Sequence, residues 1–347
     1  MSASVHIDEG QRRRLDGWLD EHGVHGENCE VERVTTGHSN ELFRVRRGEQ
    51  VLALRRPPAS PLSPTAHDMV REHRVLQAIA ASDAPVPIPR TIGACDDPSV
   101  IGAPFMVMEF VDGVVARHGV PEPLASEPPA QLADALVDVL ADLHAIDWRA
   151  AGLEDLGRPD GFLERQVTRW SSQLDSYRTR PLPAVDEVAA WLTAQPVPSQ
   201  PAALLHGDYT LVNVLFAPTP PVRIAAVLDW EQATIGDPLV DVGWLLGLWH
   251  DRGEPRLHGA EAGVIGLPDA PGMPDRAELA ERYARRSGRD LGALPYYCAL
   301  ALFKLACVME GSYARYTSGR SDDPYFAILE EAVPQLAERA LTLIGRS

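Results

Sequence analysis

The chain has 347 residues, of which 45% are hydrophobic and 23% charged, and its formal net charge is −17. This size and composition are ordinary for a folded protein with two lobes, and they exclude a chain that is disordered throughout. Nucleic acid is not expected as a partner, because phosphate contacts require a basic stripe and the sequence has none. No apolar run approaches the roughly 18 residues of a membrane span, and no apolar signal core follows the N-terminus, so we expect neither membrane insertion nor export.

The cysteines and the single lysine indicate the compartment and limit the chemistry. The four cysteines show no C-x-x-C spacing, which favours a reduced, cytoplasmic protein. Lys304 is the only lysine, so any other site that would use a lysine must use a different residue. Because Lys304 falls in an apolar helical segment, a snorkelling or paired side chain is expected there rather than a substrate contact.

The N-terminal third is expected to be a mostly antiparallel sheet with one inserted helix. The hairpin signal Arg47-Gly48-Glu49 separates two alternating segments, and Ser63 or Thr65 is expected to open the inserted helix, which runs to about residue 81. A surface helix is expected first, over residues 8–22. The expected strands cover residues 29–35, 41–46, 50–55, 90–95 and 104–110.

The remaining two thirds are expected to be mostly helical. Two short apolar strands, over residues 203–205 and 224–228, flank the most polar motif of the chain. The Pro- and Gly-rich residues 251–274 are expected to form a long loop, either a lid or an exposed excursion. Helical periodicity covers residues 128–147, 161–177, 185–194, 275–287, 294–316 and 325–344.

Three polar residues of this motif suggest phosphoryl transfer. Asp208 follows the first short strand, Asn213 closes the loop after it, and Asp229 ends the second strand. A hairpin of the two strands would bring these side chains to one end. Carboxylate and amide oxygens there would suit Mg²⁺, and a further carboxylate could orient a hydroxyl and accept its proton.

Two other interpretations of the motif remain open. Asp208 and Asp229 could be turn residues, with Asn213 a local cap. A metal hydrolase could instead use His206 and His250 together with the two aspartates, and it would bind Zn²⁺ or Mn²⁺ without a nucleotide.

The other polar residues near the motif are expected to support it rather than to contact substrate. His206 is expected to fix the loop by hydrogen bonds. Asp237 and Asp241 are expected to brace the loop and to cap a helix that begins near Pro238.

The motif and other segments resemble the aminoglycoside phosphotransferase family of kinase-like enzymes, most closely the subgroup fused in front of acyl-CoA dehydrogenases. This resemblance implies an α+β, bilobal protein-kinase-like fold. A small antiparallel N-lobe with one key helix (residues 1–112) would bind the nucleotide, and a larger, mostly helical C-lobe (residues 113–347) would hold the catalytic loop and the acceptor site. The segments that carry the resemblance are residues 37–40, 54–58, 71–76, 100–109, 143–144, 166–170, 204–216, 227–241, 303–306 and 315–316.

The resemblance also implies roles for individual residues. Asp208 matches the catalytic aspartate, and Asn213 and Asp229 match the Mg²⁺ ligands. Arg55 stands where the family has the strand lysine that holds ATP phosphates, and Glu72 matches its helix partner. Arginine is permanently charged and forks onto phosphate oxygens, so it can take this role with a different geometry.

Four further residues are implied to bind the nucleotide. Ser39 and Asn40 would lie in the loop that covers the phosphates, although this loop has one glycine instead of G-x-G-x-x-G. Glu109 and Val111 belong to the segment that would lie against adenine.

The function expected from the resemblance is a Mg²⁺-dependent kinase that uses ATP, or GTP, to phosphorylate a hydroxyl of a small molecule. The acceptor could be a hydroxyacyl compound, with Arg165 and Arg169 as anion contacts, or an aminoglycoside antibiotic. Thr210 and Val212 depart from the family pattern, which keeps a nucleotide-binding pseudokinase open as an alternative. A monomer or a homodimer is expected.

Overall fold

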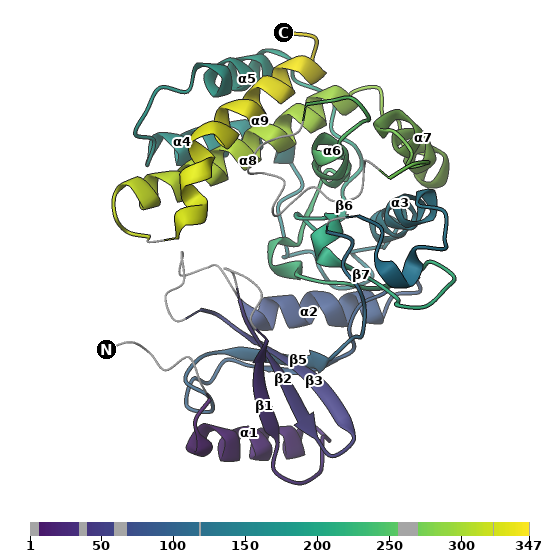
Figure 1. The fold of residues 1–347 in the computed structure, drawn as a ribbon, viewed down its shortest axis with the longest axis vertical. Coiled ribbons are helices and arrows are strands. Elements are labelled where there is room, and N and C mark those ends of the chain that lie inside the picture. The colour runs from purple at the N-terminus through teal and green to yellow at the C-terminus, as the bar shows by residue number, and fades with distance from the viewer. Residues whose placement is uncertain are drawn as a thin grey trace.

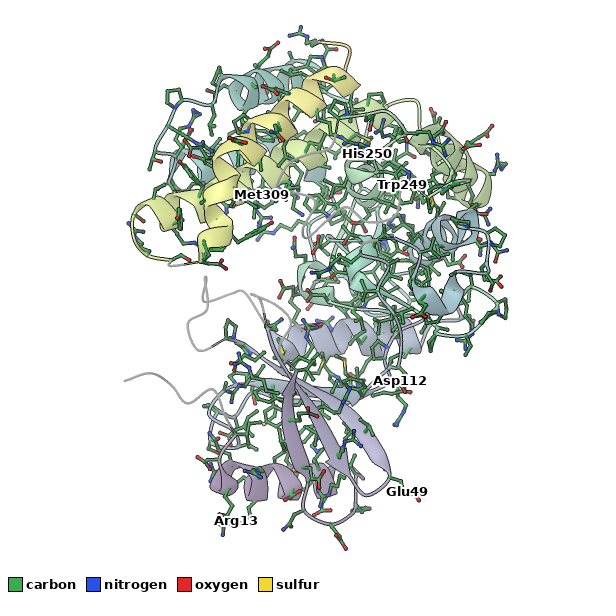
Figure 2. The ribbon with its side chains drawn as sticks, viewed as in Figure 1. Arg13, Glu49, Asp112, Trp249, His250 and Met309 are labelled. Atoms are coloured by element: carbon green, nitrogen blue, oxygen red, sulfur yellow. The ribbon has the colours of Figure 1, made fainter. Side chains whose placement is uncertain are left out.

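The computed structural model describes residues 7–34, 40–58, 68–117, 119–255, 270–321 and 323–346. It is an α+β structure with a small lobe, which holds a sheet and two helices, and a larger helical lobe (Figure 1). Asp112 lies where the chain leaves the sheet and approaches the helical lobe (Figure 2). The two-lobed, kinase-like fold class expected from the sequence is confirmed.

The small lobe contains a five-stranded, fully antiparallel sheet. Its strand order is β1-β2-β3-β5-β4. The hairpin signal is confirmed, because Arg47 pairs with Gln50 and Gly48 takes a φ of 58° in the turn. The strands are β1 Glu30–Val34, β2 Glu41–Arg47, β3 Gln50–Arg56, β4 Thr91–Cys95 and β5 Phe105–Glu109.

The two faces of the sheet are covered by different helices. Helix α1 (Glu9–Glu21) packs on one face, where its Leu15 and Leu19 share a buried hydrophobic cluster with Leu52 and Leu54 of β3. Helix α2 (Met69–Ala80) is part of the core on the other face, which includes Ala53 of β3. Because successive strand residues point to opposite faces, Arg55 also lies on the α2 face.

Helix α2 begins later than the sequence suggested. Asp68 is its N-cap and accepts a hydrogen bond from the backbone N–H of Arg71. The expected start at Ser63 or Thr65 lies outside the described residues. Glu72 is therefore in the first turn of α2 and faces the sheet, where it is buried.

The helical lobe is built around α8. This helix packs against α4, α6 and α9, and Gly243 of α6 permits close approach because a Cβ there would lie 2.5 Å from the Tyr297 backbone. The segment expected as one helix over residues 325–344 is instead η5 (Pro324–Ile328) followed by α9. The helices are α3 Ala130–His144, α4 Phe162–Asp175, α5 Pro183–Ala194, α6 Leu239–Leu248, α7 Arg276–Ser287, α8 Leu294–Thr317 and α9 Leu329–Leu343.

Helix α8 is long and apolar enough to span a bilayer by length and composition, which the sequence reading had not expected. Two thirds of its most apolar window (67%) is buried inside the protein, as in the core helix of a folded domain. Among the described residues, α8 is the one helix that is both long and apolar enough to span a bilayer.

The expected hairpin between the two short strands of the motif is wrong. Strand β6 (Ala203–Leu205) pairs with β9 (Thr234–Gly236), and β7 (Val214–Phe216) pairs with β8 (Ile224–Val227). Strands of three or four residues carry too little periodicity to reveal their partners. The polar residues still converge, because β7 and β8 form a hairpin of their own.

Residues 256–269, the central part of the expected long loop, lie outside the described residues. Its first residues are fixed to the helical lobe: Arg276 bonds to Glu254 at 2.9 and 3.0 Å, and Arg339 bonds to it at 3.0 Å. Whether this segment acts as a lid remains a prediction.

Candidate active site

Asn213 and Asp229 lie together at the open end of the β7–β8 hairpin. The backbone N–H of Leu228 donates to the carbonyl of Asn213 at 2.8 Å, which joins the residues that precede β7 and follow β8. Asp229 has a φ of 66°, in the left-handed region that residues other than glycine rarely adopt. This conformation turns the chain directly from β8 into η3 (Trp230–Gln232).

Asp208 is held by two hydrogen bonds to its carboxylate. Asn213 donates through Nδ2 to Oδ2 at 3.0 Å, and also to the Asp208 carbonyl at 2.8 Å. The indole N–H of Trp244 donates to Oδ1 at 2.9 Å. Burial raises the pKa of the Asp208 carboxyl group, and the Lys304 ammonium opposes that effect. The structure thus brings Asp208 and Asn213 into direct contact, with a basic side chain nearby.

The backbone before Asp208 is braced as expected. The buried carboxylate of Asp241 accepts from the N–H groups of His206 and Gly207, at 2.7 and 2.9 Å. Gly207 has a φ of 83°, and a Cβ on it would lie 2.5 Å from the carbonyl oxygen of Gln232, so only glycine fits. Asp237 accepts from the N–H of Leu239 at 3.0 Å, at the start of α6.

The ring of His206 is also used structurally. Its Nε2 contacts the Leu228 carbonyl at 2.9 Å, and its Nδ1 accepts from the backbone N–H of Asp208 at 3.2 Å. Neither nitrogen is left for a metal. Within the described part of the chain, no three His, Cys, Asp or Glu side chains form a group that could hold an ion. The hydrolase interpretation with His206 and His250 therefore lacks a ligand set.

Arg55 connects the two lobes through two carboxylates. Its guanidinium forms an ion pair with Glu72 through Nη1, and Nη2 lies 2.6 Å from Asp229 Oδ1. Burial alone would lower the pKa of Arg55, but Glu72 and Asp229 outweigh it and raise the pKa, so the group stays charged. Burial raises the pKa of Glu72, with Arg55 opposing.

Arg56 points to the opposite face of the sheet, as the alternation predicts. It bonds to Glu41 at 2.7 Å and lies over the Phe43 ring, 4.9 Å from its centroid. Arg55, and not Arg56, is therefore the basic residue that faces the site.

The residues expected to contact a nucleotide lie in separate segments of the structure. Asn40 donates to Glu231 Oε2 at 3.1 Å, which places the start of β2 against η3, while Ser39 lies outside the described residues. Glu109 is the exposed last residue of β5. Val111 lies in the connecting segment, whose Val114 forms a β-bridge with Phe216 of β7. The segment after β5 thus passes close to the hairpin that carries Asn213 and Asp229.

Two contacts of the site were not expected from the sequence. Trp244 holds the Asp208 carboxylate, and its position three residues after Asp241 on α6 was the available signal. Arg71 bonds to the carbonyl of Glu231 at 3.2 Å and also to that of Ala233, which fixes the turn after Asp229. Its neighbour Glu72 indicated that this part of α2 faces the second lobe.

The side chains at the hairpin end fit a magnesium ion. The amide nitrogen of Asn213 donates to Asp208, which leaves the amide oxygen of Asn213 available as a metal ligand. Asp229 accepts from Arg55 through Oδ1, so its Oδ2 is available as a second ligand. A carboxylate and an amide oxygen are hard ligands of the kind that Mg²⁺ takes together with phosphate. The roles of these residues remain predictions.

Comparisons with known proteins identify the family of the chain. Residues 30–295 match the model of the phosphotransferase enzyme family. Acyl-CoA dehydrogenase family member 11 from Gallus gallus is 35% identical over 320 residues, which are 91% of this chain and 40% of that protein. The chain spans less than half the length of the first curated relatives that it matches.

Two solved structures share the fold. A crystal structure from Ralstonia eutropha JMP134, provisionally named an aminoglycoside phosphotransferase, has a TM-score of 0.80 at 32% identity and covers 96% of this chain and 98% of its own. Aminoglycoside phosphotransferase APH(4)-Ia, in a ternary complex with AMP-PNP and hygromycin B, has a TM-score of 0.60 at 17% identity, covering 98% and 99%. Fold and site together define a kinase-like phosphotransferase. The chain belongs to the phosphotransferase enzyme family.

Proposed function

We propose that this protein transfers the γ-phosphoryl group of ATP to a hydroxyl group of a small molecule. The observation that carries the proposal is the contact of Asn213 with Asp208 at the end of the hairpin that also carries Asp229. This arrangement joins an acceptor-activating carboxylate to two oxygen donors for a metal. A turn or cap alone would not require Trp244 to hold the same carboxylate.

In the proposed reaction Asp208 orients the acceptor hydroxyl and takes up its proton as the new O–P bond forms. The bond between the γ-phosphorus and the β,γ-bridging oxygen breaks, and ADP leaves. Asn213 and Asp229 would hold Mg²⁺, which neutralises phosphate charge when bound. Arg55 would add permanent positive charge at the phosphates, with Glu72 holding it in place. Positioning and electrostatics would supply most of the acceleration.

ATP is the proposed donor, and the AMP-PNP complex of the structural relative supports a nucleotide in this fold. GTP remains an alternative. The names of the curated relatives favour a hydroxyacyl compound over an aminoglycoside as acceptor. The four cysteines are free thiols, which fits the cytoplasmic location that we propose.

The test is an untargeted phosphorylation screen. The protein, Mg²⁺ and ATP are incubated with a panel of hydroxylated metabolites that includes aminoglycosides, and products are identified by mass spectrometry together with ADP release. Asp208→Asn is the matched control, because it keeps the shape and loses the proton acceptor. We expect its turnover to fall by roughly 10²–10⁴-fold, with nucleotide binding retained. Nucleotide binding without transfer to any acceptor would instead establish the pseudokinase.

A further inference from the structure

Two basic side chains near the catalytic loop, Lys304 and Arg169, form no ion pair with a carboxylate among the described residues, although Asp208 lies near enough to act on the Lys304 charge. Lys304 of α8 donates to the Gly207 carbonyl at 2.9 Å and to Gln232 Oε1 at 3.1 Å, and both partners are neutral. Arg169 of α4 lies over the Trp170 ring, 5.0 Å from its centroid. Within the described ranges, neither residue forms an ion pair. Arg169 is exposed, whereas Lys304 is half-buried and still has only neutral hydrogen-bond partners.

Lys304 lies at the reacting end of the site. Gly207, which accepts its hydrogen bond, directly precedes Asp208. Its ammonium is 4.3 Å from the ring centroid of Trp244, whose indole N–H bonds Asp208, and 5.7 Å from that of Trp170. A basic group at this point stands beside any hydroxyl that Asp208 orients.

The same corner contains unused hydrogen-bond donors. The ammonium of Lys304 has three N–H groups, of which two have partners in the structure. The bond to Gln232 lies on the exposed side, so the side chain reaches the surface of the site. The indole Nε1 of Trp170 is buried and has no hydrogen-bond partner among the described residues. A cluster of donors without acceptors is suited to an anion.

We infer that Lys304, with Arg169, binds an anionic group of the acceptor beside the hydroxyl that is phosphorylated. The substrate class is then a hydroxylated carboxylate, or another small hydroxylated anion, and not a polycation. The inference rests on the proposed function and specifies its acceptor. Lys304 would bind the acceptor and hold it for Asp208, and Arg169 would add charge from the next helix across the Trp170 ring.

Arg165 does not share this role, although the sequence offered it as an anion contact. Its guanidinium bonds to the backbone carbonyls of Asp160 and Arg158. It lies one turn before Arg169 on the same helix α4. Arg165→Gln therefore removes the same charge from the same helix, but from a guanidinium that is already held by backbone carbonyls.

The experiment measures transfer to short-chain hydroxycarboxylates, each paired with its neutral primary amide, for wild type, Lys304→Met, Lys304→Arg, Arg169→Gln and Arg165→Gln. We expect wild type to prefer the carboxylates, and Lys304→Met to lower their kcat/KM by about 10- to 100-fold, mainly through acceptor KM. The amides should change little. Lys304→Arg should restore part of the preference, Arg169→Gln should weaken it, and Arg165→Gln should leave it unchanged.

Other outcomes separate the two proposals. If transfer occurs but the amides are preferred, or if the carboxylate preference survives Lys304→Met, the inference is wrong and the kinase assignment stands. If wild type transfers phosphate to none of these compounds but does so to another acceptor of the metabolite screen, the inference alone is wrong. If it transfers phosphate to no acceptor of either panel, the proposed function fails, and the inference fails with it.

Discussion

Arg55 Nη2 lies 2.6 Å from Asp229 Oδ1, although the two residues are 174 positions apart in the chain. Arg55 is the residue before the last of β3 in the small lobe, and Asp229 follows β8 in the helical lobe. The same guanidinium also pairs with Glu72 of α2. A single side chain therefore connects the sheet, the helix and the proposed metal site.

The first prediction concerns this connection. Arg55→Ala should abolish measurable transfer and destabilise the fold by about 3–5 kcal/mol, because it leaves the buried Glu72 unpaired. Arg55→Lys should retain part of the transfer, since the charge remains. ADP release and urea unfolding measure the two effects. Arg56→Ala is the control on the opposite face; it should lose stability through Glu41 with little change in turnover.

The second prediction concerns Asp229. Its φ of 66° makes alanine a poor replacement, whereas asparagine tolerates this conformation and keeps the shape. Asp229→Asn should lower turnover by at least about 100-fold and raise the Mg²⁺ concentration needed for half-maximal rate, because a charged ligand is lost. Magnesium titration of ADP release tests this, with circular dichroism as the fold control. An unchanged magnesium requirement in the folded variant would contradict the assignment.

The third prediction concerns the hydrogen bond from Trp244 to Asp208. Trp244→Phe should reduce turnover by about 10-fold or more, the usual cost of removing a bond to a charged group, and leave ATP binding intact. Trp249→Phe is a matched control, because that indole donates to the Pro274 carbonyl at 3.1 Å and not to Asp208. Equal losses in both variants would mean that packing, and not the bond, decides the rate.

The fourth prediction concerns stability and pH. His144 is buried between Tyr283 and Asp241, and burial lowers its pKa below the ordinary value of 6.5. Below about pH 6.5 the His144 ring is therefore protonated in the unfolded chain but not in the folded protein. The free energy of unfolding should fall as the pH is lowered through this range, by at most about 1.4 kcal/mol per pH unit. Urea unfolding between pH 7.5 and 5.5 measures the slope.

His144→Gln should flatten this slope between pH 6.5 and 5.5, since the titrating ring is gone. An identical slope in wild type and variant would assign the pH dependence to other groups. Asp241 acts at lower pH: burial would raise its pKa, but His144 and the loop N–H groups outweigh this and lower it. Its contribution is present above its unfolded pKa and is lost as the pH falls through the folded value.

The strands and the main ion pair could be predicted from the sequence for a simple reason. In β2 and β3, alternation of apolar and polar side chains specifies both the strands and their faces, so Arg55 and Arg56 had to point apart. The turn Gly48-Glu49 fixed the register between them. Glu72 was expected as the partner of Arg55 from the family resemblance, and the structure shows the reason: the first turn of α2 covers the face to which Arg55 points.

The pairing of the short strands could not be predicted in the same way. Leu205 pairs with Thr234, across a loop that contains a whole second hairpin, and three-residue strands hold no pattern that names a partner. The bond from Trp244 to Asp208 depends on how α6 is rotated against the loop. Gly243 packs closely against Tyr297 of α8, and apart from the spacing of Trp244 after Asp241 such a packing relation leaves no local sequence signal.

The arginine-rich composition has a practical consequence at the site. Because Lys304 is the only lysine, reductive methylation with ¹³C-formaldehyde would place a single dimethylammonium reporter on a side chain, beside Asp208. The resonance of that side chain would then follow nucleotide and magnesium binding without site-directed labelling.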